Sequence, residues 1–201
     1  MMSEFFKQLD QMEEPYMIAE IGINHNGDIN IAKKLIDSTN ACGWHCVKFQ
    51  KRNPEVCVPD HQKEIERDTP WGRMTYIDYK YKVEFEKIEY DLINEYCANK
   101  PLSWTASVWD IDSLDFINKY DVPFIKIPSA HLTNIELIKE SAQSEIPIIV
   151  STGMSDWKIV DKAVELISKY TNDFAILHCN STYPASHDDL HLNVIPEMKE
   201  R

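Results

Sequence analysis

Short apolar runs alternate with longer segments of helical periodicity along most of the chain. Six runs from residue 16 onward are rich in β-branched and aromatic residues and predict β-strands. The stretches between them are long enough for helices, and this alternation is typical of βαβ units around a parallel sheet. The six predicted strands cover residues 16–21, 46–50, 102–106, 124–127, 146–151 and 174–178.

Apolar residues between the strands recur at the spacing of one helix face. Trp157, Val160, Val164 and Ile167 step by 3, 4 and 3 positions, which predicts an amphipathic helix. A second stripe steps by 4, 3, 4 and 4 positions and predicts one more helix. We interpret both stripes as core-facing rather than as parts of a cofactor site. The second stripe consists of Tyr81, Phe85, Ile88, Leu92 and Tyr96.

Three local signals predict where elements begin and end. Thr133 followed by Glu136 has the spacing of a capping box and predicts a helix start soon after the fourth strand. Gly43 predicts the end of the helix before the second strand. Asn26 followed by Gly27 predicts a turn after the first strand.

Two segments fit the alternation less well. Residues 51–80 are rich in charge and contain three prolines, and connections of this length are usually functional lids or disordered. Residues 1–15 carry Phe5, Phe6 and Leu9 among charges, which predicts either a short helix or a strand that plugs the bottom of a barrel. We therefore expect an N-terminal segment over residues 1–15 and one domain over residues 16–201.

Six βα units fit either a complete doubly wound sheet or a (β/α)8 TIM-type barrel of which six of eight units are present. At least four predicted strands run into a polar end, in the stretches EIGINHN, KFQKR, KIPSAH and HCNSTYP. Barrel enzymes gather their chemistry from many strand ends, whereas doubly wound folds concentrate it at one switch point, usually after a glycine-rich first turn. The turn from Gly22 to Gly27 is no such motif, so the barrel is favoured.

Composition narrows the function classes. The 201 residues carry 21 Lys plus Arg against 33 Asp plus Glu, and the net charge of −12 opposes binding to nucleic acid or to an anionic membrane. No apolar run is long enough to span a membrane, and the first residues lack the pattern of a signal peptide, so a cytoplasmic location is expected. The five dispersed cysteines, without a CxxC pair, predict reduced thiols rather than disulfides or a zinc site.

Two lysines stand in apolar strands. Lys48 lies in the stretch VKFQ and Lys126 in FIKIP. A buried lysine is costly unless it is paired, so each could extend to solvent or pair with a structural carboxylate. Two at equivalent strand ends would repel each other in one barrel mouth unless an anion lay between them. We therefore favour a phosphate or carboxylate ligand.

Other polar residues follow the predicted strands. Glu20 ends the first apolar strand, where a carboxylate should have a specific partner. Several hydroxyl residues could bind a phosphate, although serine and threonine also cap helices. His178 is interpreted as a hydrogen-bonded core histidine. The hydroxyl residues are Ser107, Ser129, Ser151, Thr152, Ser181 and Tyr183.

Five motifs in this order resemble the sialic acid synthase family, whose members make N-acetylneuraminate and related nonulosonic acids. They are AEIGINHNG at residues 19–27, VKFQ at 47–50, KIPSA at 126–130, STGM at 151–154 and LHCNSTYP at 177–184. Several separate motifs in one order are far more specific than a single short pattern. The resemblance covers residues 16–201.

The resemblance implies a transferase of carbohydrate biosynthesis that condenses phosphoenolpyruvate with an N-acetylated amino sugar of the N-acetylmannosamine type and releases phosphate. It implies that Lys48 and Lys126 hold phosphoenolpyruvate, with hydroxyls from Ser107, Ser129 and Ser181. Glu20, Gln50 and Tyr183 would then face the sugar. It also implies a divalent metal, Mn²⁺ or Mg²⁺, that polarises the sugar aldehyde, and a homodimer for full-length members.

The chain departs from the family pattern in three ways. His131 stands where a glutamate often follows the strand-four lysine, so it is expected either as a substitute acid or base or as a bystander, and we assign it to the site. The stretch at residues 106–108 reads Ala-Ser-Val rather than Ser-Thr-Pro, which weakens the match at Ser107. The metal-binding histidines of strands seven and eight and the C-terminal antifreeze-like domain lie beyond the matched region. We therefore expect little synthase activity from this chain alone.

Two other functions fit the residues. A class I aldolase would form a Schiff base between a strand-end lysine and a carbonyl substrate. A non-catalytic protein of this ancestry would bind an anionic metabolite or pair with a full-length homologue. Borohydride trapping on Lys48 or Lys126 distinguishes the aldolase, and metal binding distinguishes the non-catalytic protein.

Overall fold

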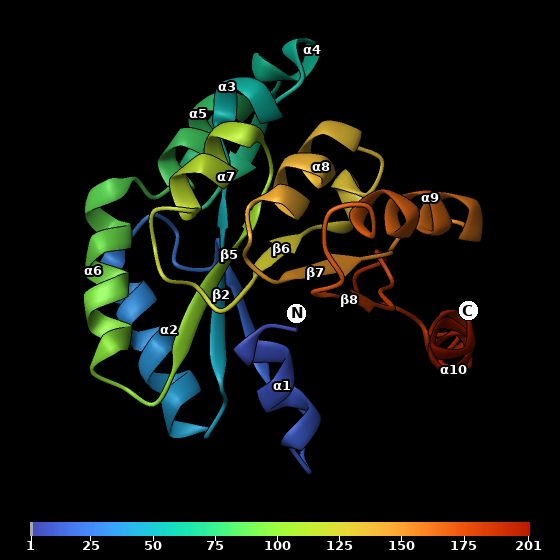
Figure 1. Cartoon of the computed structure of the whole chain (residues 1–201). Helices are drawn as coiled ribbons and strands as arrows, with labels where there is room; N and C mark the ends of the chain where they lie inside the picture. The colour runs from blue at the N-terminus through green and yellow to red at the C-terminus, as the bar shows by residue number, and fades with distance from the viewer. Residues whose placement is uncertain (1) are drawn as a thin grey trace.

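A parallel sheet of six strands forms the centre of the molecule (Figure 1). The structure, a computed structural model, describes residues 2–201. Every neighbouring pair of strands is parallel, which confirms the predicted α/β class. In spatial order the strands are β1 (Ile18–Gly22), β2 (Cys46–Lys51), β5 (Ser103–Val108), β6 (Ile125–Ile127), β7 (Ile148–Ser151) and β8 (Phe174–Leu177).

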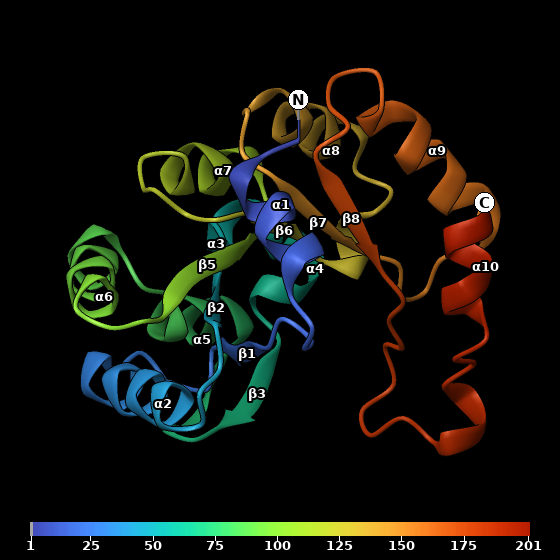
Figure 2. The same cartoon turned by 60° about the horizontal axis from the view of Figure 1, so that its bottom comes forward.

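All six predicted strands are present, and their ends lie within two residues of the prediction. Within residues 2–201, β1 pairs only with β2 and β8 only with β7, so the sheet does not close into a barrel. The helices between the strands lie around the outside of the sheet (Figure 2). They are α2 (Ile29–Ala41), α6 (Lys87–Ala98), α7 (Ile111–Ile117), α8 (Ile135–Gln143) and α9 (Trp157–Ile167), and α10 (Val194–Glu200) ends the chain.

The stripe from Tyr81 to Tyr96 does not form one helix, so this prediction was wrong. Tyr81 lies in α5 (Tyr76–Val83), and α6 begins only at Lys87. Glu86 and Glu89 form a capping box, in which the backbone N–H of Glu86 donates to Glu89 Oε2 at 3.0 Å. A capping box starts a new helix. The face of α6 that packs on the sheet carries Tyr90, Ile93 and Cys97, whereas Ile88 is 71% exposed.

Two other helix predictions have different outcomes. The predicted apolar face of α9 is confirmed, because Val160 and Ile167 are buried against the sheet. Thr133 is not the cap of α8. The side chain of Asn134 instead accepts the backbone N–H of Leu137 at 3.1 Å, which moves the helix start by one residue.

Residues 51–80 are ordered, in contrast to the loop expected from their charge and prolines. They contain α3 (Pro54–Cys57), α4 (Asp60–Lys63), an antiparallel hairpin of β3 (Glu66–Thr69) and β4 (Gly72–Thr75), and the start of α5. Asn53 caps α3, and Thr75 caps α5. The helices α3 and α4 are difficult to recognise from hydrophobic periodicity because each spans only about one turn.

The N-terminal segment forms a helix, α1 (Glu4–Gln11), across the amino ends of the strands (Figure 2). The Phe5 ring lies 5.0 Å from the Phe124 ring before β6 and 5.5 Å from the Tyr16 ring before β1. The backbone N–H of Ser3 donates to Asp173 Oδ1 at 2.9 Å, just before β8. Of the two expected forms, the helix is therefore the one observed. No helix within residues 2–201 is long and apolar enough to cross a membrane.

The turn after β1 packs tightly against α5. Asn26 and Gly27 have φ angles of +49° and +68°, which confirms the predicted turn. His25 Nδ1 accepts the backbone N–H of Gly27 at 3.1 Å, and its ring stacks on Phe85 at 3.8 Å between centroids. Burial lowers the pKa of His25 to about 4 from the ordinary 6.5.

We expect His25 to make the protein less stable in mild acid. The unfolded chain binds a proton at His25 as the pH falls below 6.5, but the folded chain binds one only near pH 4. Stability from this residue is therefore complete above pH 6.5 and is lost toward pH 4, by on the order of 3 kcal/mol in total.

Urea unfolding at about pH 7.5 and about pH 5 tests this expectation. His25→Gln should lose much less stability between the two conditions than the unmodified protein does. His61→Gln, a change at an exposed histidine, should leave the difference intact. Equal acid sensitivity in all three proteins would contradict the assignment.

Candidate functional site

A cavity of about 680 Å³ opens at the carboxyl ends of the strands. Residues from β1, β2, β5, β6 and β7 and from the loops after β6 and β8 line it, which is where parallel α/β enzymes gather their chemistry. Eight of the nine predicted site residues line this cavity. They are Glu20, Lys48, Gln50, Ser107, Lys126, Ser129, Ser181 and Tyr183.

Lys48 is buried in β2 and already has partners. Its Nζ lies 2.7 Å from Glu20 Oε2 on β1 and donates to Ser107 Oγ on β5 at 2.6 Å. Glu20 and Lys48 are register partners, so the strand pairing itself brings the carboxylate to the amine. The expected specific partner of Glu20 is therefore Lys48, and this ion pair cancels one of the two lysine charges.

Lys126 lies two strands away from Lys48 and is 8% exposed. Within residues 2–201 no carboxylate lies within 4.0 Å of its amine. Burial lowers the pKa of Lys126, and the nearby positive charge of Lys48 lowers it further. Among the described residues, Lys126 is thus the lysine of this cavity that has no carboxylate beside its amine.

Hydroxyl groups surround Gly153 beside the two lysines. The Ser129 Oγ accepts the backbone N–H of Gly153 at 3.0 Å. A β-carbon at residue 153 would lie 2.9 Å from that oxygen and would overlap Ser181 Oγ. Cys179 Sγ donates to Ser151 Oγ at 3.2 Å on the same side. Glycine is therefore required here for the two serine hydroxyls to approach the backbone.

The remaining predicted residues differ in their placement. Tyr183 lines the cavity but is 92% exposed, at its rim. His131 does not line the cavity, in contrast to its expected catalytic position. His131 lies in the short 3-10 helix at Ser129–His131, which turns the His131 ring toward Trp109. The centroids of the two rings are 5.1 Å apart. Burial lowers the pKa of His131, so the neutral imidazole is favoured.

Trp109 and Asn180 also line the cavity and were not predicted. Trp109 follows β5 directly, so the rule that strand ends carry the site could have identified it. Trp109 carries neither a charge nor a hydroxyl group, so the pattern of charges and hydroxyls at the strand ends did not indicate it. Asn180 lies within the stretch HCNSTYP, and the polar residues of this stretch did indicate that the loop belongs to the site.

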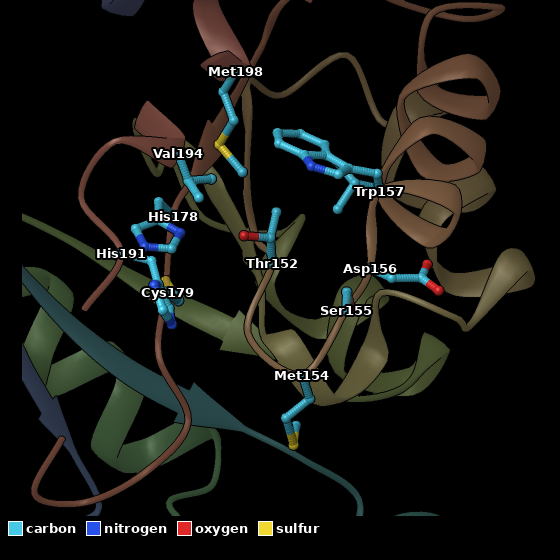
Figure 3. Close-up of a pocket in the computed structure, with 11 residues that line it drawn as sticks. Thr152, Met154, Ser155, Asp156, Trp157, His178, Cys179, His191, Val194 and Met198 are labelled. Atoms are coloured by element: carbon cyan, nitrogen blue, oxygen red, sulfur yellow. The ribbon is translucent and has the colours of Figure 1, made fainter. Parts of the chain in front are cut away.

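A second cavity of about 420 Å³ lies between α9, the segment after β8 and α10 (Figure 3). Trp157, Val194 and Met198 contribute apolar walls, and no lysine or arginine lines it. His178 Nε2 makes a hydrogen bond with the backbone carbonyl of Leu190 at 2.7 Å, as expected for a satisfied histidine. The first cavity is therefore the one that combines lysine amines with hydroxyl groups, as the binding of an anion requires.

The donor set does not fit a metal ion. Across residues 2–201 no three His, Cys, Asp or Glu side chains come together as a possible metal site. The first cavity offers one carboxylate, Glu20, and its oxygen is engaged by Lys48. What the described residues can bind is an oxyanion, through amines and hydroxyls.

Comparison with known proteins gives a family and several relatives. The NeuB family model matches residues 35–201. The N-acetylneuraminate-9-phosphate synthase of Drosophila melanogaster is 36% identical over 193 residues, which cover 94% of this chain and 52% of that protein. The N,N'-diacetyllegionaminic acid synthase of Legionella pneumophila is 29% identical, and the match covers 54% of that protein. The chain thus spans about half the length of the curated relatives it matches.

Comparison with solved structures gives matches to the same kind of enzyme and to the same fold. The sialic acid synthetase of Leptospira borgpetersenii, crystallised with citrate, matches with a TM-score of 0.83 and 29% identity over 92% of this chain and 61% of that one. A phospho-2-dehydro-3-deoxyheptonate aldolase of Thermotoga maritima matches with a TM-score of 0.65 at 11% identity, over 92% of this chain and 48% of that one. The second likeness concerns the fold alone.

Proposed function

Because the chain belongs to the NeuB family of nonulosonic acid synthases, we propose that it forms the phosphoenolpyruvate-binding part of such a synthase. The reaction would condense phosphoenolpyruvate with an N-acetylated amino sugar of the N-acetylmannosamine type. The observation that carries the proposal is Lys126, a buried amine without a close carboxylate, in the same cavity as Lys48 and several hydroxyls. A chain of net charge −12 needs such a local positive field to hold a multiply charged anion.

Each cavity residue has a proposed role. Lys126 and Lys48 bind the phosphate and carboxylate of phosphoenolpyruvate through charge-assisted hydrogen bonds. Ser107 supports Lys48, to which it is bonded at 2.6 Å. Ser129 and Ser181, beside Gly153, add hydroxyls to the same anion. These groups hold the anion in one orientation and exclude bulk water from it.

The bond changes define what the cavity must stabilise. The methylene carbon of phosphoenolpyruvate bonds to the aldehyde carbon of the open-chain sugar, water adds its oxygen to the former enol carbon, and the phosphate leaves. Positive charge develops on the enol carbon while the aldehyde oxygen becomes negative. Glu20 lies in the cavity with its side chain 60% exposed, and we propose that it and Gln50 face the sugar, with Tyr183 at the rim.

Replacing Glu20 with glutamine should raise the affinity for inorganic phosphate several-fold. The Glu20 carboxylate neutralises Lys48 at 2.7 Å, so an amide in its place leaves two uncompensated amines facing the anion. Titration calorimetry with phosphate measures the effect. Exposed Glu165→Gln makes the same change in net charge and should have no effect. A weaker affinity in Glu20→Gln would show that Lys48 does not face the anion.

Calorimetry with phosphoenolpyruvate tests the proposed function directly. We expect binding to the described chain, and no measurable binding would refute the assignment. Turnover is a separate question, because the described donors do not fit a metal. The divalent metal, the homodimer, the particular amino sugar and the cytoplasmic location all stay predictions. Robust turnover by this chain with phosphoenolpyruvate, N-acetylmannosamine and Mn²⁺ would overturn the expectation of little activity.

A Schiff-base aldolase is the second candidate, because a lowered lysine pKa is what imine formation needs. Lys126 has a pKa lowered by burial and no close carboxylate. Incubation with pyruvate and borohydride, followed by mass spectrometry, distinguishes the two functions. A reduced adduct on Lys126 would favour the aldolase, and its absence with intact phosphoenolpyruvate binding favours the synthase. If neither ligand binds, the non-catalytic alternative gains support.

A further inference from the structure

The amide of Gln50 is held in one orientation. The Arg52 Nη2 donates a hydrogen bond to Gln50 Oε1, two residues away. A guanidinium has donors only, so the atom of Gln50 that faces it has to be the carbonyl oxygen. The orientation of this amide therefore follows from the chemistry of its partner.

The other end of the amide lies at the cavity. Gln50 Nε2 is the atom nearest to the position that a β-carbon would take on Gly22, at 3.4 Å. Gly22 and Gln50 both line the large cavity. With Oε1 engaged by Arg52, the hydrogen-bonding group that Gln50 has left for a ligand is its N–H₂ group, which only donates.

Arg52 is itself fixed by a buried carboxylate. Arg52 is 4% exposed, and its Nε lies 3.3 Å from Glu84 Oε2. The backbone N–H of Arg52 donates to Glu84 Oε1 at 2.9 Å. The guanidinium also lies over the Trp109 ring, 4.7 Å from its centroid. The backbone bond holds the Glu84 carboxylate in place, and the charge of that carboxylate and the stacking on Trp109 together favour the guanidinium position that faces Gln50.

We propose that Arg52, held by Glu84, is a positioning residue that fixes Gln50 as a hydrogen-bond donor to an oxygen of the amino sugar. The inference rests on the proposed function, since the sugar is the ligand that function supplies. A free glutamine amide turns easily and offers donor or acceptor alike. A charge-assisted bond to one end favours a single orientation by about tenfold or more. The pair would thereby select a ligand that presents an acceptor at this point.

The orientation can be measured without a ligand. In the unmodified protein, NMR should show nuclear Overhauser contacts between the Gln50 side-chain N–H₂ and the Gly22 α-protons. The double variant Arg52→Met, Glu84→Gln removes the donor together with its buried counter-charge, and Lys51, which also lies near Glu84, keeps Glu86 Oε1 at 3.2 Å as its partner. We expect these contacts to weaken in it. Contacts of equal strength in both proteins would show that Arg52 does not set the orientation and would overturn the inference.

Ligand affinity gives the second readout. The double variant should bind N-acetylmannosamine about tenfold more weakly and phosphoenolpyruvate within about twofold of the original. Gln50→Glu keeps an acceptor for Arg52 but loses the donor, so it should retain the melting temperature and lose sugar binding. Unchanged sugar affinity in Gln50→Glu would overturn the inference even if the double variant does not fold.

Lys51→Met is the matched control. Lys51 is a buried cation on β2, the strand that also carries Gln50, and its Nζ lies 3.6 Å from Glu84 Oε1. Unlike Arg52, it donates a hydrogen bond to the Phe85 carbonyl rather than to Gln50. Its loss should lower the melting temperature and leave both affinities unchanged. If Arg52 were merely structural, the two cations would behave alike. If phosphoenolpyruvate does not bind while the NMR contacts depend on Arg52, the proposed function fails and the positioning by Arg52 stands.

Discussion

Replacing Lys126 with methionine is expected to abolish phosphoenolpyruvate binding while leaving the fold at least as stable as before. The amine of Lys126 is buried and has no carboxylate within 4.0 Å among residues 2–201. Losing its contact with the anion should cost on the order of 2–5 kcal/mol of binding free energy. Methionine keeps the apolar stem and removes a charge that burial disfavours, so the folded state should gain rather than lose stability.

Calorimetry and thermal unfolding of the same samples measure the two effects. Lys158→Met removes an exposed lysine on α9 and changes the net charge equally, so it controls for long-range electrostatics. It should change neither quantity. An unchanged affinity together with a lower melting temperature in Lys126→Met would identify Lys126 as a structural residue and refute its role in anion binding.

Gly27→Ala should be the most destabilising single substitution proposed for this protein. Gly27 has a φ of +68°, and an added β-carbon would overlap the backbone carbonyl oxygen of Lys82 at the end of α5. Backbone cannot move aside as a flexible side chain can, so we expect the free energy of unfolding to fall by about 3 kcal/mol or more. Denaturant unfolding at neutral pH measures this loss.

Gly43→Ala is a close control, because Gly43 has a φ of +70° but nothing within 4 Å of the added carbon. Its cost should be the conformational strain alone, about 1 kcal/mol. The difference between the two variants therefore reports the collision with Lys82. Equal losses would mean that α5 shifts freely and that the turn is not locked against it.

The strands could be predicted because each is a short, mostly apolar run, and most of them have polar residues at their ends. Lys48 and Lys126 could be found for the same reason, since a lysine in such a run is conspicuous. The pairing of Lys48 with Glu20 could not be derived, because it depends on the register of β1 against β2. Register is a tertiary property that a single sequence does not specify.

The wrong predictions have local causes. The stripe from Tyr81 to Tyr96 crosses residues 84–86, where α5 has ended and the cap at Glu86 starts α6. The catalytic role expected for His131 came from the family resemblance, because it stands where a glutamate often follows the strand-four lysine, and it stays a prediction. A residue in a short 3-10 turn can face either side, and here it faces Trp109. Arg52 was not singled out, because its role depends on Glu84, 32 residues further along the chain.

The bond between Ser3 and Asp173 joins two points that are 170 residues apart in the chain. Contacts at such separation carry a large loop-closure entropy and gain nothing until the strands between them are assembled. We therefore expect α1 to dock late in folding, so that removing residues 2–11 speeds unfolding far more than it slows refolding in stopped-flow experiments. Along the described chain α1 precedes every strand of the sheet, yet in the order of folding the segment that closes the amino end of the sheet comes last.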